Sequence, residues 1–132
     1  MTLLDTNVVV HYLKGEPGVV ARIQAMEAAD LGIPSVVAYE LEYGTLRSGS
    51  PRRRELIGQL LADSVHVPFD HEAAREAARI RVELEGQGTV IGPMDLLIAG
   101  TATSRGALLV TSNTREFSRV KGLRLADWTS QQ

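Results

Sequence analysis

Short apolar runs alternate with longer amphipathic stretches along the chain. The runs are too short for helices, and several are rich in β-branched residues, so they predict strands. Between them, apolar residues recur three and four positions apart, which is typical of helices packed on one face. Strands that alternate with helices predict an α/β fold with a mostly parallel central sheet flanked by helices. The expected strands centre on residues 3–4, 31–33, 65–67, 107–110 and 123–125.

Turn and capping residues divide the amphipathic stretches into separate helices. Gly15 is expected to end the first helix, and Pro17 to open the second. Ser35 and Asp70 are expected N-caps, because a short side-chain oxygen can accept from the first free backbone N–H groups. No repeat, low-complexity run or linker interrupts the chain, so residues 1–132 are expected to form a single domain. The expected helices span residues 6–14, 17–26, 35–46, 51–61, 72–85 and 94–104.

Composition narrows the class of protein. The 132 residues are 44% hydrophobic and 23% charged, as in ordinary globular domains. The absence of Cys excludes disulfides, thiolate catalysis and Cys-based zinc sites. Neither a membrane span nor a signal peptide is recognisable, so we expect a cytoplasmic protein with no membrane partner. The net charge of −2 gives no global basic footprint, although Arg residues cluster locally.

Four acidic residues stand beside apolar sequence in comparable positions. Asp5 directly follows the first apolar run, and the carboxyl ends of strands line the functional crevice of open α/β sheets. An unpaired carboxylate in an apolar setting is costly, and neighbouring carboxylates repel one another. Such acids usually share a cation. The other three members of this set are Glu40, Asp95 and Glu116.

Each acid also has a purely structural interpretation. Asp5 is a possible N-cap for the following helix, and Asp95 a first-turn residue that stabilises the helix dipole. Glu40 faces the apolar stripe of its helix and could pair with an Arg, whereas Glu116 could be an ordinary loop acid. Taken together, the four acids favour a shared site more than any one of them does alone.

The residue types that accompany the acids restrict the chemistry. His11, His66 and His71 show no metal-ligand spacing, and no nucleophile elbow or phosphate-binding glycine motif is present. A set made only of oxygen ligands selects a hard cation such as Mg²⁺ or Mn²⁺. The reaction that most needs this set is phosphodiester hydrolysis by a metal-activated water. Four further residues are expected to support the acids or the substrate, by hydrogen bonds from Thr111 and Asn113 and by phosphate contacts from Arg115 and Arg119.

Four segments in order resemble the successive motifs of PIN-domain ribonucleases, and in particular the VapC toxins of bacterial toxin–antitoxin pairs. The closing region, with Arg115-Glu116-Phe117 and Asp127-Trp128, resembles a VapC subgroup in which some members cut tRNA in the anticodon stem-loop. The resemblance covers essentially the whole chain. The four segments are Leu3-Leu4-Asp5-Thr6-Asn7, residues 38–44, residues 92–100 and residues 110–117.

The resemblance implies a three-layer, Rossmann-like PIN fold and Mg²⁺-dependent endoribonuclease activity. It also implies a homodimer, an RNA substrate that some relatives take from tRNA, and a VapB-like antitoxin that forms a heteromeric complex with the toxin. Asp5 and Asp95 match the direct metal ligands of the family. Glu40 matches a ligand that acts directly or through water, and Glu116 a more peripheral acid. Thr6 and Asn7 belong to the first motif as supporting residues, and Asn113 stands where many PIN domains carry Asp, so a second metal site would lack a ligand.

Three other interpretations remain open from the sequence. A PIN-type nuclease of RNA processing, or a structure-specific DNA nuclease, would share these motifs. A receiver-like or phosphatase α/β domain would phosphorylate an Asp, although Asp5 lacks an adjacent second acid. In a non-catalytic binding module the acids would be structural. Metal-dependent RNA cleavage would distinguish the ribonuclease from a non-catalytic binding module. A phosphoryl-aspartate adduct would identify a receiver-like or phosphatase domain.

Overall fold

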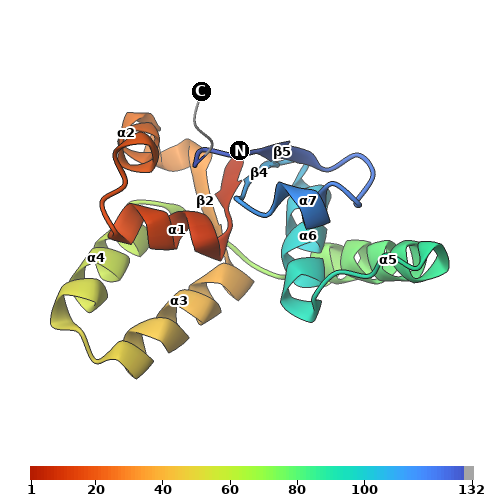
Figure 1. Cartoon of the computed structure of the whole chain (residues 1–132), viewed down its shortest axis with the longest axis horizontal. Helices are drawn as coiled ribbons and strands as arrows, with labels where there is room; N and C mark the ends of the chain where they lie inside the picture. The colour runs from red at the N-terminus through yellow and green to blue at the C-terminus, as the bar shows by residue number, and fades with distance from the viewer. Residues whose placement is uncertain (130–132) are drawn as a thin grey trace.

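The computed structural model describes residues 1–129 and is built around one five-stranded sheet (Figure 1). All four strand pairs are parallel, which confirms the α/β class predicted from the sequence. The strand order is β3-β2-β1-β4-β5. The strands are β1 (Thr2–Leu4), β2 (Leu31–Pro34), β3 (Val65–Val67), β4 (Leu108–Val110) and β5 (Arg124–Ala126).

Helices flank the sheet. Figure 1 shows α1, α2 and α4 to one side of the central strands and α5 and α6 to the other, which gives the three-layer arrangement. The six long helices correspond to those expected, whereas the short α7 and the 3₁₀ turn η1 were not predicted. The helices are α1 (Thr6–Leu13), α2 (Pro17–Ala25), α3 (Ser35–Ser48), α4 (Pro51–Ala62), α5 (His71–Gln87), α6 (Pro93–Arg105) and α7 (Thr114–Phe117), with η1 at Ala28–Asp30.

The central strands form the middle of the core. Leu3, Leu4, Leu109 and Val110 are all fully buried. Continuous apolar strands of this kind are expected where helices cover both faces of a parallel sheet. Within residues 1–129, none of the helices combines the length and apolar character needed to cross a lipid bilayer.

The strand order creates a switch point between β1 and β4. From β1 the chain first adds β2 and β3 on one side, and later adds β4 and β5 on the other. The connection that follows β1 and the one that follows β4 run to opposite sides of the sheet. Their divergence opens a crevice beyond the carboxyl ends of these two strands. Asp5 follows β1 and Thr111 follows β4, so both lie at this crevice.

The predicted cap at Asp70 is confirmed, but the one at Ser35 is wrong. The Asp70 side chain accepts a hydrogen bond from the Ala73 backbone N–H at 2.9 Å. At α3 the cap position belongs to Pro34, because its extended backbone ends β2 and the helix begins at the next residue. The Ser35 hydroxyl instead donates to the Val67 carbonyl oxygen at 3.4 Å and so ties the start of α3 to β3.

Candidate active site

A cleft of about 480 Å³ opens at the switch point of the sheet. It is formed by the ends of β1 and β4 and by the first turns or inner faces of α1, α3 and α6. Three of the four predicted acids line it, together with three of the predicted supporting residues. The lining residues are Asp5, Thr6, Asn7, Val10, His11, Glu40, Asp95 and Asn113.

Asp5 is fixed at the floor of the cleft. Its side chain is 4% exposed, and its backbone N–H donates to the Val110 carbonyl oxygen at 2.9 Å, which joins the ends of β1 and β4. Oδ1 accepts from the Thr6 backbone N–H at 2.8 Å, so Asp5 is also the N-cap of α1. Oδ2 accepts from the Thr111 hydroxyl at 2.8 Å and from the Asn7 amide at 3.1 Å. Asp5 is therefore both the N-cap of α1 and a lining residue of the cleft.

Electrostatics at Asp5 are a balance between burial and these hydrogen bonds. Burial raises the pKa of the Asp5 carboxyl above its ordinary value, and the charge of Glu40 adds to this rise. The hydrogen bonds from Thr111, Thr6 and Asn7 act in the opposite direction. The hydrogen bonds thus hold an anionic group in a buried position where it would otherwise favour protonation.

A small network behind Asp5 holds the loop that follows β4. Asn7 Oδ1 accepts from the Ser112 backbone N–H at 3.0 Å while the Asn7 amide contacts Asp5. The fully buried Thr111 hydroxyl donates to Asp5 and accepts from the Asn113 backbone N–H at 3.0 Å. The hydrogen bond from Thr111 to Asp5 is the kind expected from the sequence, and the set of contacts couples the first and fourth motifs.

Glu40 approaches the cleft from α3. The Thr6 hydroxyl donates to Glu40 Oε1 at 2.6 Å, so a residue of the first motif orients a carboxylate that is 34 positions away. Among residues 1–129, Glu40 forms no ion pair, and the Arg partner considered for it is not found there. The neighbouring Glu42 is exposed, as expected for a residue on the opposite face of the helix.

Asp95 lies in the first turn of α6, at the mouth of the cleft. Burial raises the pKa of this carboxyl to about 6, and neighbouring carboxylates contribute to the rise. In decreasing order of effect these are Asp5, Glu116 and Glu40. No hydrogen bond from residues 1–129 offsets the rise, whereas three do so at Asp5. All four predicted acids are therefore close enough to interact, and Asp95 is the one whose charge is least compensated.

Glu116 and the two predicted RNA-binding arginines lie outside the lining of the cleft. Glu116 is half-buried on α7, where the Asn113 amide donates to its Oε2 at 2.8 Å. Arg115 is exposed, and Arg119 donates to the Val90 carbonyl oxygen at 3.4 Å. Contact of either arginine with RNA remains a prediction.

His11 is a lining residue that the sequence argument did not single out. It follows Asn7 by four residues on α1, so the two side chains share a helix face. Gly15, at φ +74°, turns the chain so that the Glu16 backbone N–H donates to the His11 carbonyl oxygen at 3.1 Å. The side chains of His11 and Glu16 also form a hydrogen bond. The four-residue spacing between Asn7 and His11 could have indicated that both side chains face the site. This spacing is informative only once α1 is known to border the cleft.

The donor set of the cleft fits a hard divalent cation. In residues 1–129 no three His, Asp or Glu side chains form a tight preformed cage for a metal ion. Mg²⁺ does not require such a cage, because it usually binds one or two carboxylates and keeps several waters. Asp5 and Asp95 provide carboxylate oxygens, Glu40 stands beside them, and the one lining histidine, His11, is hydrogen-bonded to Glu16. The uncompensated charge at Asp95 is the feature that a cation would relieve.

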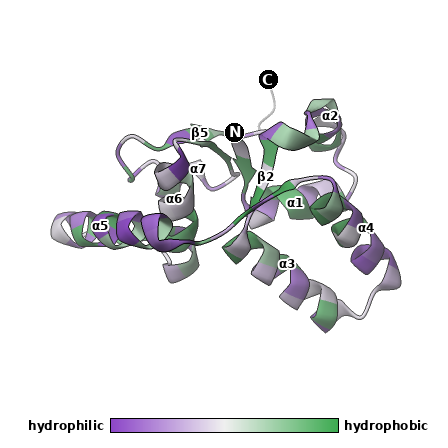
Figure 2. Ribbon diagram, turned by 180° about the vertical axis from the view of Figure 1, so that it is seen from behind, coloured by the Kyte–Doolittle hydropathy of each residue, from purple (hydrophilic) through white to green (hydrophobic). Residues whose placement is uncertain are grey.

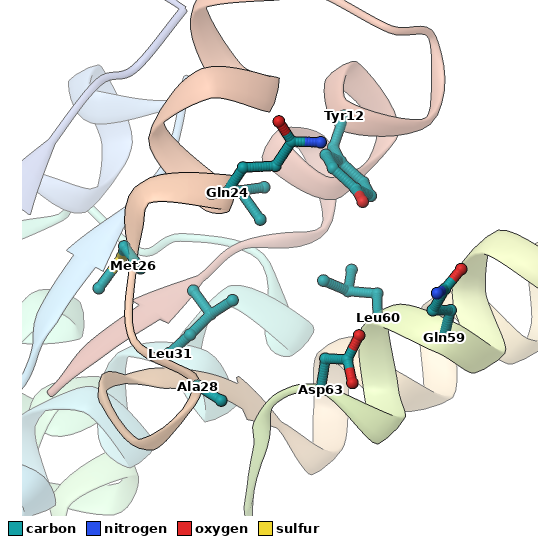
Figure 3. A pocket seen from close by; sticks show the side chains of 9 residues that line it. Tyr12, Gln24, Met26, Ala28, Leu31, Gln59, Leu60 and Asp63 are labelled. Carbon is teal, nitrogen blue, oxygen red and sulfur yellow. The ribbon is translucent and has the colours of Figure 1, made fainter.

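A second hollow of about 400 Å³ lies on the other side of α1, between α1, α2 and α4. Figure 3 shows six of its lining side chains around it, namely Tyr12, Gln24, Leu31, Gln59, Leu60 and Asp63. It contains no pair of carboxylates, because Asp63 is its only acidic lining residue. The acidic cleft is therefore chemically distinct from this hollow.

A parallel sheet with a carboxylate-lined cleft at its switch point is an arrangement suited to a metal-dependent hydrolase. A family model described as the PIN domain matches residues 2–123. The tRNA(fMet)-specific endonuclease VapC of Shigella flexneri is 40% identical over 128 residues, which are 96% of this chain and 97% of that protein. The protein of the same name from Salmonella typhimurium is 36% identical over 127 residues, or 96% of each chain. The chain belongs to the PIN-domain family, in its group of VapC ribonucleases.

Solved structures agree with this assignment. The VapBC complex of Salmonella typhimurium, solved bound to DNA, contains a chain with a TM-score of 0.89 and 36% identity. The match covers 96% of this chain and 97% of that one. VapBC2 of Rickettsia felis, solved with a fragment of promoter DNA, gives a TM-score of 0.87 at 30% identity and covers 96% and 98%. The resemblance stated from the sequence motifs is thus confirmed.

Proposed function

We propose that this protein is the toxin of a toxin–antitoxin pair and that it cuts tRNA by metal-dependent hydrolysis at the acidic cleft. The observation that carries the proposal is the convergence of four carboxylates from different elements, with the pKa of Asp95 raised to about 6. Membership of the VapC ribonucleases supports a nuclease over a receiver-like domain or a non-catalytic module. The substrate class is supported by the relatives that are named tRNA(fMet)-specific endonucleases.

Each acid has a distinct part in the proposed reaction. Asp5 and Asp95 would hold the cation, Asp5 as a rigid ligand because Thr111 and Asn7 hydrogen-bond it, and Asp95 as a less constrained one at the mouth of the cleft. A divalent cation held there would supply positive charge for the phosphate in the transition state and would make the attacking water more acidic.

The remaining polar residues orient water and substrate. Glu40, held by the Thr6 hydroxyl, would accept a hydrogen bond from the attacking water and so orient it toward the phosphate. Glu116 acts from the rim of the cleft. Its negative charge raises the pKa of Asp95, and a cation bound beside Asp95 would offset this repulsion. Asn113 positions Glu116 by its amide, and as a neutral residue it leaves a second metal site without one carboxylate.

We further propose a VapB-like antitoxin as the regulatory partner. Relatives of the chain are found in VapBC complexes in solved structures. A guanidinium group can satisfy two carboxylate oxygens at once, so an antitoxin Arg fits the acidic cleft when no cation fills it. A segment of the antitoxin would also fit the second hollow, whose exposed lining is mainly polar and includes Gln24, Gln59 and Asp63 (Figure 3). The toxin is proposed to be a homodimer in the cytoplasm, where its tRNA substrate is found.

The test is cleavage of an unfractionated tRNA pool by the purified protein, followed by sequencing of the new RNA ends. The proposal expects a small number of cut sites in Mg²⁺ or Mn²⁺ and none in excess EDTA. A matched assay with branched and duplex DNA covers the alternative of a structure-specific DNA nuclease. Metal-dependent cutting of DNA but not RNA would replace the proposed substrate, and cutting of RNA that is undiminished in EDTA would contradict the metal mechanism.

A further inference from the structure

His11 differs in chemistry from every other side chain that lines the acidic cleft. It is the only lining residue that can carry positive charge, because no Lys or Arg is among them. The lining acids hold no proton to donate while they bind a cation, since the cation favours their ionised form. His11 is half-buried on α1, so its ring is accessible to a molecule in the cleft. The cleft therefore combines a carboxylate site for a cation with a single imidazole.

Glu16 fixes the orientation of the His11 ring. A carboxylate can only accept a hydrogen bond, so the Nδ1–H of His11 donates to Glu16 Oε2. Glu16 is not among the residues that line the cleft. Within residues 1–129 the other ring nitrogen, Nε2, forms no hydrogen bond. Nε2 is therefore the nitrogen left for a group in the cleft, and the partner of Nδ1 determines which nitrogen that is.

The side-chain pair of His11 and Glu16 is not needed to close the turn between α1 and α2. The backbone already closes this turn, because the Glu16 N–H donates to the His11 carbonyl oxygen at 3.1 Å. The Gly15 N–H donates to the Tyr12 carbonyl oxygen at 3.0 Å. The two side chains are 33% and 34% exposed, and pairs at such exposure contribute little to stability. The effect of the pair is thus to hold the ring rather than the fold.

The proposed hydrolysis needs a proton at the oxygen that leaves. When water attacks phosphorus, the bond from phosphorus to one ribose oxygen breaks, and its electron pair stays on that oxygen. An alkoxide is a poor leaving group, and a positioned proton donor typically contributes about 10²–10⁴-fold to such a step. Histidine is the side chain that most often transfers protons near neutral pH. Among the residues that line the cleft, only His11 meets this need.

We propose that His11 is a further catalytic residue, the proton donor to the leaving ribose oxygen, and that Glu16 is its positioning residue. The water oxygen bonds to phosphorus, and the water proton leaves along its hydrogen bond to Glu40. The ribose oxygen departs with the electron pair of the broken bond and takes the proton from His11 Nε2. Solvent then returns a proton to Nε2. This proposal rests on the ribonuclease function proposed above and adds the donor that completes its proton transfers.

The test compares two oligoribonucleotides that carry the cut site found by sequencing the new tRNA ends. One is unmodified, and in the other sulfur replaces the bridging oxygen that leaves, which the chemistry of the new ends identifies. A thiolate leaves without a proton, because a thiol is much more acidic than an alcohol. Single-turnover rates are measured for each variant and compared with the wild-type rate on the same RNA.

His11→Gln keeps a polar side chain but removes the proton donor. It should cut the unmodified RNA at least about 100-fold more slowly than the wild type. It should cut the sulfur-containing RNA at nearly the wild-type rate, because that leaving group needs no proton. His71→Gln is the matched control, since His71 is exposed at the start of α5 and outside the cleft. The control should cut both RNAs at the wild-type rate.

Glu16→Gln tests the positioning residue. The amide oxygen still accepts from His11 but carries no charge, so the unmodified RNA should be cut about 10-fold more slowly. Cutting of the sulfur-containing RNA should again be nearly unchanged. A purely structural role for Glu16 would instead slow both RNAs to the same extent.

The outcomes separate this inference from the proposed function. If the wild type cuts neither RNA, the proposed function fails. If the wild type cuts both and His11→Gln cuts the unmodified RNA equally fast, the inference is wrong while the function stands. Equal slowing of both RNAs in a folded His11→Gln would also overturn the inference, because sulfur would then rescue nothing. Should circular dichroism show that His11→Gln is unfolded, the same comparison on Glu16→Gln decides.

Discussion

Asp95 illustrates how position in the fold changes the behaviour of a single carboxyl group. Its pKa is raised from 3.8 to about 6, first by burial and then by the neighbouring carboxylates. Since the folded pKa is above the unfolded one, the folded state keeps its proton to higher pH. The unfolded state releases its proton first, so the Asp95 contribution to stability falls as pH rises from about 4 to about 6.

We therefore expect Asp95→Asn to stabilise the metal-free protein at pH 7 by about 1–2 kcal/mol, after allowance for solvent screening at this half-exposed site. At pH 4.5 the gain should be much smaller, because the wild-type carboxyl is then mostly protonated in the folded state. Urea unfolding of both proteins in EDTA at the two pH values measures the difference. An equal gain at both pH values would show that Asp95 does not carry this charge penalty.

Residue chemistry explains which site residues could be predicted from the sequence. The sequence was sufficient to predict Asp5, Glu40 and Asp95 as candidate site residues. A carboxylate beside apolar sequence is costly to bury, so its presence there indicates a special role. The hydrogen bond from Thr6 to Glu40 could not be predicted, because it joins residues 34 positions apart and depends on how α1 and α3 pack. His11 was missed because a histidine on a helix face has no sequence signal of its own.

At the level of the elements, the strands and long helices followed from hydrophobic periodicity alone. The N-cap of α3 was assigned wrongly to Ser35 because Ser is a common cap, whereas Pro34 occupies the cap position by its backbone geometry. The short α7 was missed because four residues give no helical period to detect. Its position is nevertheless important, since it carries Glu116 to the rim of the cleft.

The packing of α5 against α6 depends on Gly100. A Cβ at this position would lie 2.7 Å from the Ala73 carbonyl oxygen and 2.7 Å from the Ala77 Cβ. Because the obstacle at Ala73 is backbone, the helices would have to separate, and α6 carries Asp95 in its first turn. We expect Gly100→Ala to lower the free energy of unfolding by about 1–3 kcal/mol.

The control for this variant is Gly58→Ala. Gly58 lies within α4, and nothing stands within 4 Å of an added Cβ. Alanine should stabilise this helix by about 0.5–1 kcal/mol, because it restricts the unfolded chain and favours helix. Chemical denaturation of the two variants measures both effects. Equal responses at the two sites would show that close packing at Gly100 is not a constraint.

On the scale of the whole molecule, α1 separates the acidic cleft from the second hollow. Asn7 and His11 face the cleft, and the adjacent Tyr12 lines the hollow. Hydrophilic and hydrophobic residues alternate along the helices, as Figure 2 shows from behind. We propose that a single extended antitoxin segment crosses α1 and occupies both sites, with a polar part in the hollow and a basic part in the cleft.

This arrangement predicts competition between the antitoxin and the groups that fill the cleft. Raising the Mg²⁺ concentration should weaken antitoxin binding, and Glu40→Gln should weaken it further, because each removes negative charge available to an antitoxin Arg. Calorimetric titration of the two purified proteins across a Mg²⁺ series measures both effects. Tight binding that is insensitive to Mg²⁺ and to Glu40→Gln, with RNA still cleaved in the complex, would show that the antitoxin acts elsewhere.

The central claim is that carboxylates from separate elements form one metal-dependent site for RNA cleavage. The most direct measurement is the rate at which a single tRNA is cut in saturating Mg²⁺ by the wild type, Asp5→Asn, Asp95→Asn and Asp63→Asn. The control residue Asp63 is an acid of the second hollow. The account predicts a loss of at least about 100-fold for the two cleft variants and none for the control, because the amide keeps the shape and removes the anionic ligand. Cleavage by Asp5→Asn or Asp95→Asn at the wild-type rate would contradict it.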